Sequence, residues 1–242
     1  MLRTLVWFLY FWLYLVVALP RLLHAKKLDR QGLIAERDAY VERMTKRWAC
    51  AMTRAAGGKV EVSGNEHVPA DAPVVFIANH QGNYDIPIMI GHVVGRKALI
   101  SKIEVLKIPI LRSWMKLMQC EFMDRKNLRQ SARIIQQAVE SLRGGTSMVI
   151  FPEGTRSKSD KLGDFKHGSF KLALKAEVPI VPVTIDGSWR LFERTGFMTP
   201  GTIRVVVHPP VPTAGLTKEE QDALPDRIRG IIAAGLPNGG VG

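Results

Sequence analysis

The stretch "PVVFIANHQGNYDIPI", residues 73–88, passes from an apolar run into a polar loop. The run 73–80 is typical of a buried strand that ends near His80, and Asp85 follows five positions later. A carboxylate bonded to one imidazole nitrogen fixes the tautomer and leaves the other nitrogen to act as a base. The loop has no serine or cysteine, so the nucleophile would be a hydroxyl of a substrate. The same pattern also fits a histidine that only closes a turn, and spacing alone leaves both interpretations open.

The pattern on both sides of this stretch predicts a single α/β domain. Short apolar runs alternate with segments of helical periodicity, an order that favours a largely parallel or mixed sheet flanked by helices. Thr217 and Glu220 form a capping-box signature before the last helix. We expect strands over 59–64, 73–80, 97–102, 146–151, 179–186 and 202–210, and helices over 85–94, 126–145, 170–178 and 216–224. In such sheets ligands bind beyond the carboxyl ends of the strands.

The first 56 residues have a different composition. Residues 5–19, "LVWFLYFWLYLVVAL", are uncharged and almost wholly apolar, but short of the roughly 20 residues that a crossing helix needs. Residues 21–54 follow with nine Lys/Arg against four Asp/Glu, and with apolar residues at helical spacing. A signal peptide, or a solvated helix packed on the domain, are alternative interpretations. We expect 1–56 to be a membrane-docking helical pair, most simply monotopic on the cytoplasmic face of the inner membrane, and 57–242 to be the α/β domain.

The net charge of the chain indicates which kind of partner it binds. The chain has 242 residues and a net charge of +12, which favours an anionic partner such as nucleic acid, an anionic membrane or a phosphorylated substrate. No nucleic-acid reader motif is recognisable, and the apolar N-terminus favours lipid. The two cysteines, Cys50 and Cys120, suggest neither a disulfide framework nor a zinc site.

A second polar loop, "FPEGTRS" at 151–157, follows another expected strand. Gly154 permits a tight turn with exposed backbone N–H groups that suit anions. Arg156 adds a planar guanidinium matched to phosphate oxygens, and Glu153 could orient that arginine or bind a hydroxyl. An ordinary surface turn is the alternative interpretation.

Together the two loops resemble motifs of the glycerolipid acyltransferase family, most closely the bacterial 1-acyl-glycerol-3-phosphate acyltransferases. The family's N-H-x4-D block corresponds to Asn79, His80 and Asp85, and its F-P-E-G-T-R-S block is identical at 151–157. A fourth, apolar block corresponds to "VPIVPV" at 178–183, which fits a plain core strand equally well. The second block corresponds to Lys102, Leu106, Pro109, Asp124 and Arg125. Three residues after that proline the family usually has glycine, and here Arg112 stands in its place.

The resemblance implies acyl transfer from acyl-CoA or an acyl carrier protein to the free hydroxyl of lysophosphatidic acid, giving phosphatidic acid. His80, held by Asp85, would be the general base, and no metal or other cofactor is implied. The family motifs imply that the acceptor is held by Lys102, Arg125, Glu153, Gly154, Thr155 and Arg156. An acyltransferase for another lysophospholipid or a lyso-ornithine lipid is an alternative. A non-enzymatic membrane-binding protein is a remoter one, because it would leave His80 and Asp85 without a role.

Overall fold

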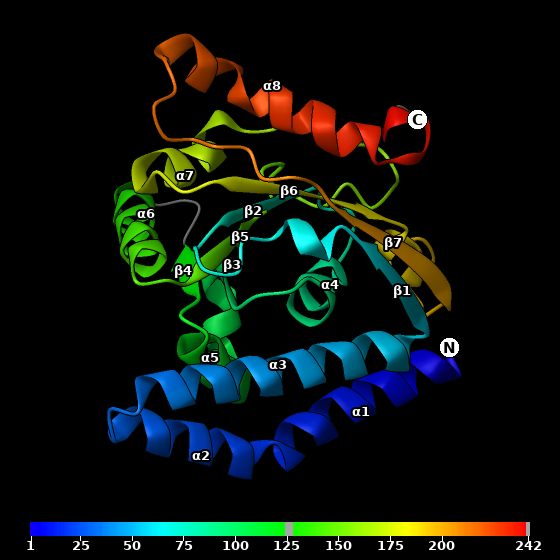
Figure 1. The fold of residues 1–242 in the computed structure, drawn as a ribbon. Helices are drawn as coiled ribbons and strands as arrows, with labels where there is room; N and C mark the ends of the chain where they lie inside the picture. Colours follow the sequence, from blue (N-terminus) through cyan, green and yellow to red (C-terminus); the bar gives the residue numbers. More distant parts are fainter. Residues whose placement is uncertain (124–127, 241–242) are drawn as a thin grey trace.

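The computed structural model describes residues 1–123 and 128–240, and within them seven strands form one sheet in the order β1-β7-β6-β2-β5-β3-β4 (Figure 1). The neighbours of β2, which are β5 and β6, both run parallel to it. β7 is antiparallel to β6 and parallel to β1, so the sheet is mixed, as predicted. The strands are β1 (Gly58–Ser63), β2 (Val75–Ala78), β3 (Lys97–Lys102), β4 (Glu121–Met123), β5 (Ser147–Ile150), β6 (Ile180–Asp186) and β7 (Gly201–Val207).

Burial explains the composition of the strands. Every residue of β2 and β6 is buried, which is why β2 and the first four residues of β6 are continuous apolar runs and do not alternate. β1 lies at an edge of the sheet, and its more and less exposed residues alternate. β4, which also lies at an edge, was not predicted, because three residues carry too little periodicity to recognise.

Helices cover both faces of the sheet. In Figure 1, α8 and α7 lie above the sheet, whereas α4 and α5 lie between the sheet and the N-terminal helices. α8 begins at the predicted capping box, in which Thr217 accepts from the Glu220 backbone and the Glu220 side chain accepts from Thr217. The helices of the domain are α4 (Asp85–His92), α5 (Pro109–Leu117), α6 (Leu128–Arg143), α7 (Lys171–Ala176) and α8 (Lys218–Ala234).

The N-terminal region is helical, as expected, but its basic segment is divided in two. α1 (Leu2–Val17) leads into α2 (Leu19–Arg30), and α3 (Ile34–Ala56) follows a turn in which Gly32 has a φ of +72°. α3 then ends at Gly57, whose φ of +94° provides a left-handed cap before β1 begins. No single helix of the described residues has the length and apolarity to cross a membrane, whereas α1 and α2 pass that test together, with a bend of 42° between them.

α1 and α3 are attached to the domain by specific contacts. The Trp7 indole of α1 donates to the Met52 carbonyl of α3 over 3.1 Å, and its ring meets Tyr84 at a centroid distance of 6.0 Å. α3 crosses α4 closely, since a Cβ on Gly91 would lie 3.0 Å from the Cys50 sulfur. The N-terminal helices therefore form a layer beneath α4 and α5 that packs against the domain (Figure 1).

Candidate active site

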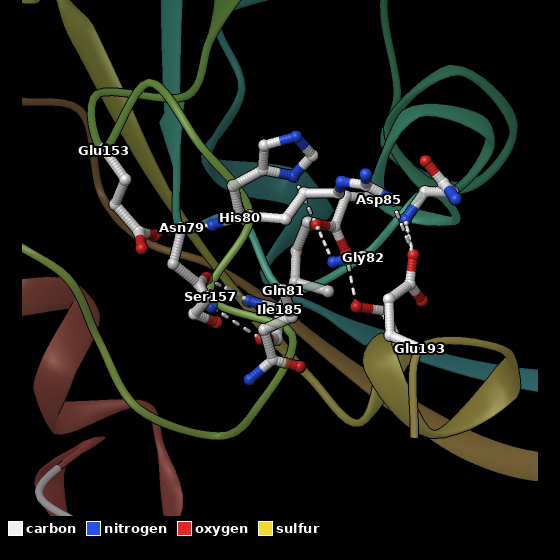
Figure 2. A network of polar contacts seen from close by, with 12 residues as sticks. Asn79, His80, Gln81, Gly82, Asp85, Glu153, Ser157, Ile185 and Glu193 are labelled. Atoms are coloured by element: carbon white, nitrogen blue, oxygen red, sulfur yellow. Dashed lines mark hydrogen bonds and ion pairs between the residues drawn. The ribbon is translucent and has the colours of Figure 1, made fainter. Parts of the chain in front are cut away.

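His80 and Asp85 lie together at the carboxyl end of β2. His80 is two residues beyond the strand, and Asp85 is the first residue of α4. The His80 Nδ1 lies 2.7 Å from Asp85 Oδ2, which fixes Nδ1 as the protonated nitrogen. In Figure 2 the other edge of the imidazole points away from the carboxylate. The His80 ring therefore has the orientation and the tautomer that a general base requires.

The Asp85 carboxylate is fully buried and accepts from three groups. Besides His80, the Gly82 backbone N–H donates to Oδ2 over 2.8 Å, and the Ser188 hydroxyl donates to Oδ1. Ser188 is buried as well and lies in the turn after β6. Three donors on one buried carboxylate fix its orientation.

The Glu153 carboxylate supports the backbone of the histidine. Its Oε1 accepts from the His80 N–H over 2.7 Å, and its Oε2 accepts from the Gly163 N–H over 3.1 Å. Burial raises the pKa of Glu153 above its usual range, and these two backbone N–H groups offset part of that rise. Both oxygens are thus engaged by backbone, so Glu153 connects the "FPEGTRS" loop to the β2 loop.

The same two loops are joined at further points. The Ser157 N–H donates to the His80 carbonyl over 2.8 Å, and the Lys158 N–H donates to the Gln81 carbonyl over 3.1 Å. The Phe151 ring stacks on the His80 imidazole at a centroid distance of 4.2 Å and an interplanar angle of 20°. The imidazole is held in place by Phe151 on one face and by Asp85 at Nδ1.

The remaining predicted residues differ in their exposure and in their partners. Gly154 has a φ of +70°, as the predicted tight turn requires, and Thr155 beside it is exposed. Arg156 is about one-third exposed and pairs with Glu193 over 3.0 Å, so Glu193, rather than Glu153, is the carboxylate on this arginine. Lys102 is exposed at the end of β3. Arg125, like Asp124, lies outside the described residues.

Three polar residues of this network were not predicted: Gln81, Ser188 and Glu193. The Gln81 Oε1 accepts from the Gly187 N–H over 2.9 Å and so connects the β2 loop to the end of β6. The signal for the other two was the polar segment that follows the buried strand β6. A strand that neighbours β2 delivers its carboxyl end to the same place.

A cavity of about 400 Å³ adjoins this network on the side of the N-terminal helices. Asn83 and Tyr84 of the β2 loop contribute to its wall. Burial raises the pKa of Tyr84 further above neutrality, and its hydroxyl donates to the Met198 sulfur, so that side chain is uncharged. The rest of the lining is mainly apolar and comes largely from α1, α3, α4 and α5, including Trp7, Phe11, Trp48, Ile90 and Trp114.

A sequence model of the acyltransferase family matches residues 59–186, the segment that contains both polar loops. This chain belongs to the acyltransferase family. The match begins in β1 and ends with β6, so it includes His80, Asp85 and Glu153 but ends before Ser188 and Glu193.

Similar acyltransferases come from distant organisms. A 1-acyl-sn-glycerol-3-phosphate acyltransferase of Chlamydomonas reinhardtii is 36% identical over 78% of this chain and 56% of its own length. The human alpha enzyme of the same name is 36% identical over 72% of this chain and 62% of its own length. The chain thus spans little more than half the length of these curated relatives.

Among solved structures, the crystal structure of a 1-acyl-sn-glycerophosphate acyltransferase, PlsC, from Thermotoga maritima is similar along almost the whole chain. The two agree with a TM-score of 0.80 and 29% sequence identity, over 97% of this chain and 95% of that one. The similarity therefore includes the N-terminal helices as well as the sheet.

Proposed function

We propose that this acyltransferase moves a fatty acyl group from a thioester to the free sn-2 hydroxyl of 1-acyl-glycerol-3-phosphate and forms phosphatidic acid. The names of its relatives support the acceptor and the product. The observation that carries the proposal is the 2.7 Å contact of His80 Nδ1 with the buried Asp85, because it leaves the other ring nitrogen to take a proton.

The proposed chemistry balances without a metal or a redox step. His80 Nε2 takes the proton of the acceptor hydroxyl, and the oxygen attacks the thioester carbonyl. This attack forms the new C–O bond and a tetrahedral oxyanion. When the oxyanion collapses, the carbonyl re-forms, the C–S bond breaks and the sulfur takes the proton from His80, so that a thiol leaves. Asp85 stabilises the imidazolium between these steps. General base catalysis of this kind contributes roughly 10²–10⁴-fold.

We propose that the acceptor's phosphate binds at the "FPEGTRS" loop. The exposed part of Arg156 supplies donors suited to phosphate, and Gly154, Thr155, Glu153 and Lys102 belong to the same family blocks. Arg125 is assigned to this site by the motif alone. Glu153 contributes indirectly in this proposal, because its oxygens already accept from the backbone.

The apolar cavity supports a lipid substrate. Its aromatic and aliphatic lining suits an alkyl chain, whose burial is favourable at about 25 cal/mol per Å². Asn83 and Tyr84 belong both to its wall and to the loop between His80 and Asp85. We propose that an acyl chain enters this cavity while its reacting end stays at His80.

We propose that residues 1–56 attach the enzyme to the cytoplasmic face of the inner membrane without crossing it, and that 57–242 is the catalytic domain. α1 keeps one face on α3 through Trp7, while Leu5, Leu9 and Leu13 are 70%, 68% and 56% exposed. A helix with one face on protein and an apolar face outward fits shallow insertion. The basic residues of α2 and α3 would meet anionic headgroups.

A single assay tests the proposal. Purified full-length protein in detergent micelles is given 1-acyl-glycerol-3-phosphate, lysophosphatidylcholine or a lyso-ornithine lipid as acceptor, each with acyl-CoA or with acyl carrier protein as donor. We expect phosphatidic acid from the first acceptor with at least one of the two donors. Turnover of another acceptor in preference to the glycerol phosphate would contradict the assignment.

A further inference from the structure

Glu193 lies outside every motif of the family and outside the segment that the family model matches. It follows the turn after β6, at Ser188–Leu191, and its side chain is 3% exposed. A glutamate carboxylate that is this buried requires partners, because an unpaired buried charge is costly. Its partners show what it does.

The Glu193 carboxylate connects the two polar loops through one oxygen. Oε1 accepts from the Asn83 N–H over 2.7 Å and from Arg156 Nη1 over 3.0 Å. Asn83 lies between His80 and Asp85, and Arg156 belongs to "FPEGTRS". Figure 2 shows the Glu193 carboxylate pointing into the network from the turn that follows β6.

Gly82 provides the space for this carboxylate. A Cβ on Gly82 would lie 2.6 Å from Glu193 Oε2, closer than real Cβ atoms approach an oxygen. Oε2 is buried and has no hydrogen-bond partner among the described residues. The bridge therefore depends on Oε1 alone, and Oε2 is in a position where an amide nitrogen could replace it.

We propose that Glu193 is a positioning residue that holds the Arg156 guanidinium toward the acceptor's phosphate and fixes its distance from His80; this rests on the proposed function. A guanidinium has five N–H donors, and Glu193 engages one nitrogen while a third of the arginine side chain stays exposed. Because Glu193 is also bonded to the backbone of the His80 loop, the phosphate site and the base keep one geometry. The acceptor thus binds with its hydroxyl within hydrogen-bond reach of the His80 imidazole.

Substitutions of Glu193 separate this role from a general structural one. Glu193→Asp keeps the charge but shortens the reach, so it cannot contact both donors, and Glu193→Ala removes the bridge. Both should raise the acceptor KM about tenfold and leave the donor KM within about twofold. Glu193→Gln keeps Oε1 and should keep the acceptor KM within about threefold of the wild type. Glu140→Ala, at an exposed position of α6, is the matched control.

A double-mutant cycle completes the test. In an Arg156→Ala background, Glu193→Asp should raise the acceptor KM no further, because the group that it positions is gone. Additive effects, equal changes of donor and acceptor KM, or a Gln variant as impaired as the Asp variant would overturn the inference. Because the Asp variant keeps the charge and loses only one methylene, and the Gln variant is nearly isosteric, the test stands even where Glu193→Ala does not fold. Absence of acyl transfer in the wild type would instead contradict the proposed function.

Discussion

At the scale of single residues, the site is organised by buried carboxylates whose partners are mostly backbone N–H groups. Each of the three accepts one backbone N–H from the segment 80–83: Glu153 that of His80, Asp85 that of Gly82 and Glu193 that of Asn83. A backbone donor keeps its position better than a long side chain does. The imidazole is therefore oriented by the fold itself, with little freedom to be lost when the substrate binds.

Glu153 makes the stability of the protein depend on pH. Burial raises its pKa, so between the ordinary glutamate pKa and the raised value the folded state binds more protons than the unfolded state. The contribution of this residue is thus present at low pH and is lost as the pH rises through the raised pKa. Relative to the wild type, Glu153→Gln should gain melting temperature as the pH rises from about 4 to about 7.

Glu153→Gln also has an effect on stability that does not depend on pH. The amide would accept only one of the two backbone N–H groups at every pH, so the melting temperature of the variant is lowered equally at pH 4 and at pH 7. Thermal melts of the two proteins over the same pH series measure the difference. A difference that does not vary with pH would contradict the role of burial at Glu153.

The sequence offered candidate residues for the site but not the contacts between them. His80, Asp85, Glu153 and Arg156 stand in short motifs, and the structure brings all four to adjoining loops. Ser188 and Glu193 could not be predicted, because they lie more than 100 residues beyond the loop that they contact. Only the pairing of β2 with β6 makes them neighbours.

At the scale of the elements, Asp38 fastens α3 to the domain. Its Oδ1 accepts from Arg37 Nε over 2.8 Å, and its Oδ2 pairs with Arg96 Nη1 over 2.5 Å, just before β3. Arg37 also reaches Asp29 of α2. One network of charges therefore joins α2, α3 and the domain, and it holds the start of α3 against the segment before β3.

Removing the centre of that network should loosen the N-terminal helices. Asp38→Ala leaves the largely buried Arg37 and the half-buried Arg96 without a shared partner, and should lower the free energy of unfolding by about 1–3 kcal/mol. Asp222→Ala, which removes an exposed pair with Lys218, should cost less than about 1 kcal/mol. Urea denaturation of both variants measures the two losses. Equal losses would show that the Asp38 network is no stronger than a surface pair.

The division of the basic segment 21–54 into α2 and α3 could not be predicted from the sequence, because it also depends on tertiary contacts. Apolar positions recur at helical spacing on both sides of Gly32, so the periodicity favoured one helix over 21–54. The structure turns the chain at that glycine and packs α2 back on α3, with Leu22, Ala25 and Leu28 buried. Tertiary packing thus decided a boundary that local preference left open.

At the scale of the whole molecule, α1 and the loop between His80 and Asp85 meet at one cavity. The cavity between them is lined by α1 and by the His80 loop together. α8 covers the other face of the sheet (Figure 1). If α1 docks on a membrane and His80 is the base, as we propose, a lipid substrate would reach His80 through this cavity without crossing the core.

Exposed leucines of α1 should control attachment to lipid. Leu9 and Leu13 are one turn apart and exposed, so Leu9→Glu/Leu13→Glu places two charges on the face that we propose inserts into lipid. The wild type should sediment with anionic vesicles even at high salt, since apolar contact is not screened, and the double variant should not. Ala214→Glu/Ala223→Glu adds the same charges near and on α8 as a control. Release of the wild type by salt alone would refute the apolar anchor.

The proposed role of His80 as the base is tested most directly by one comparison of turnover. We would measure phosphatidic acid formed from 1-acyl-glycerol-3-phosphate and the active donor by the wild type, by His80→Ala and by His167→Ala, whose histidine is exposed. We expect His80→Ala to lower kcat by about 10²–10⁴-fold in protein that remains folded, and His167→Ala to resemble the wild type. Near-normal turnover by a folded His80→Ala protein would contradict the account.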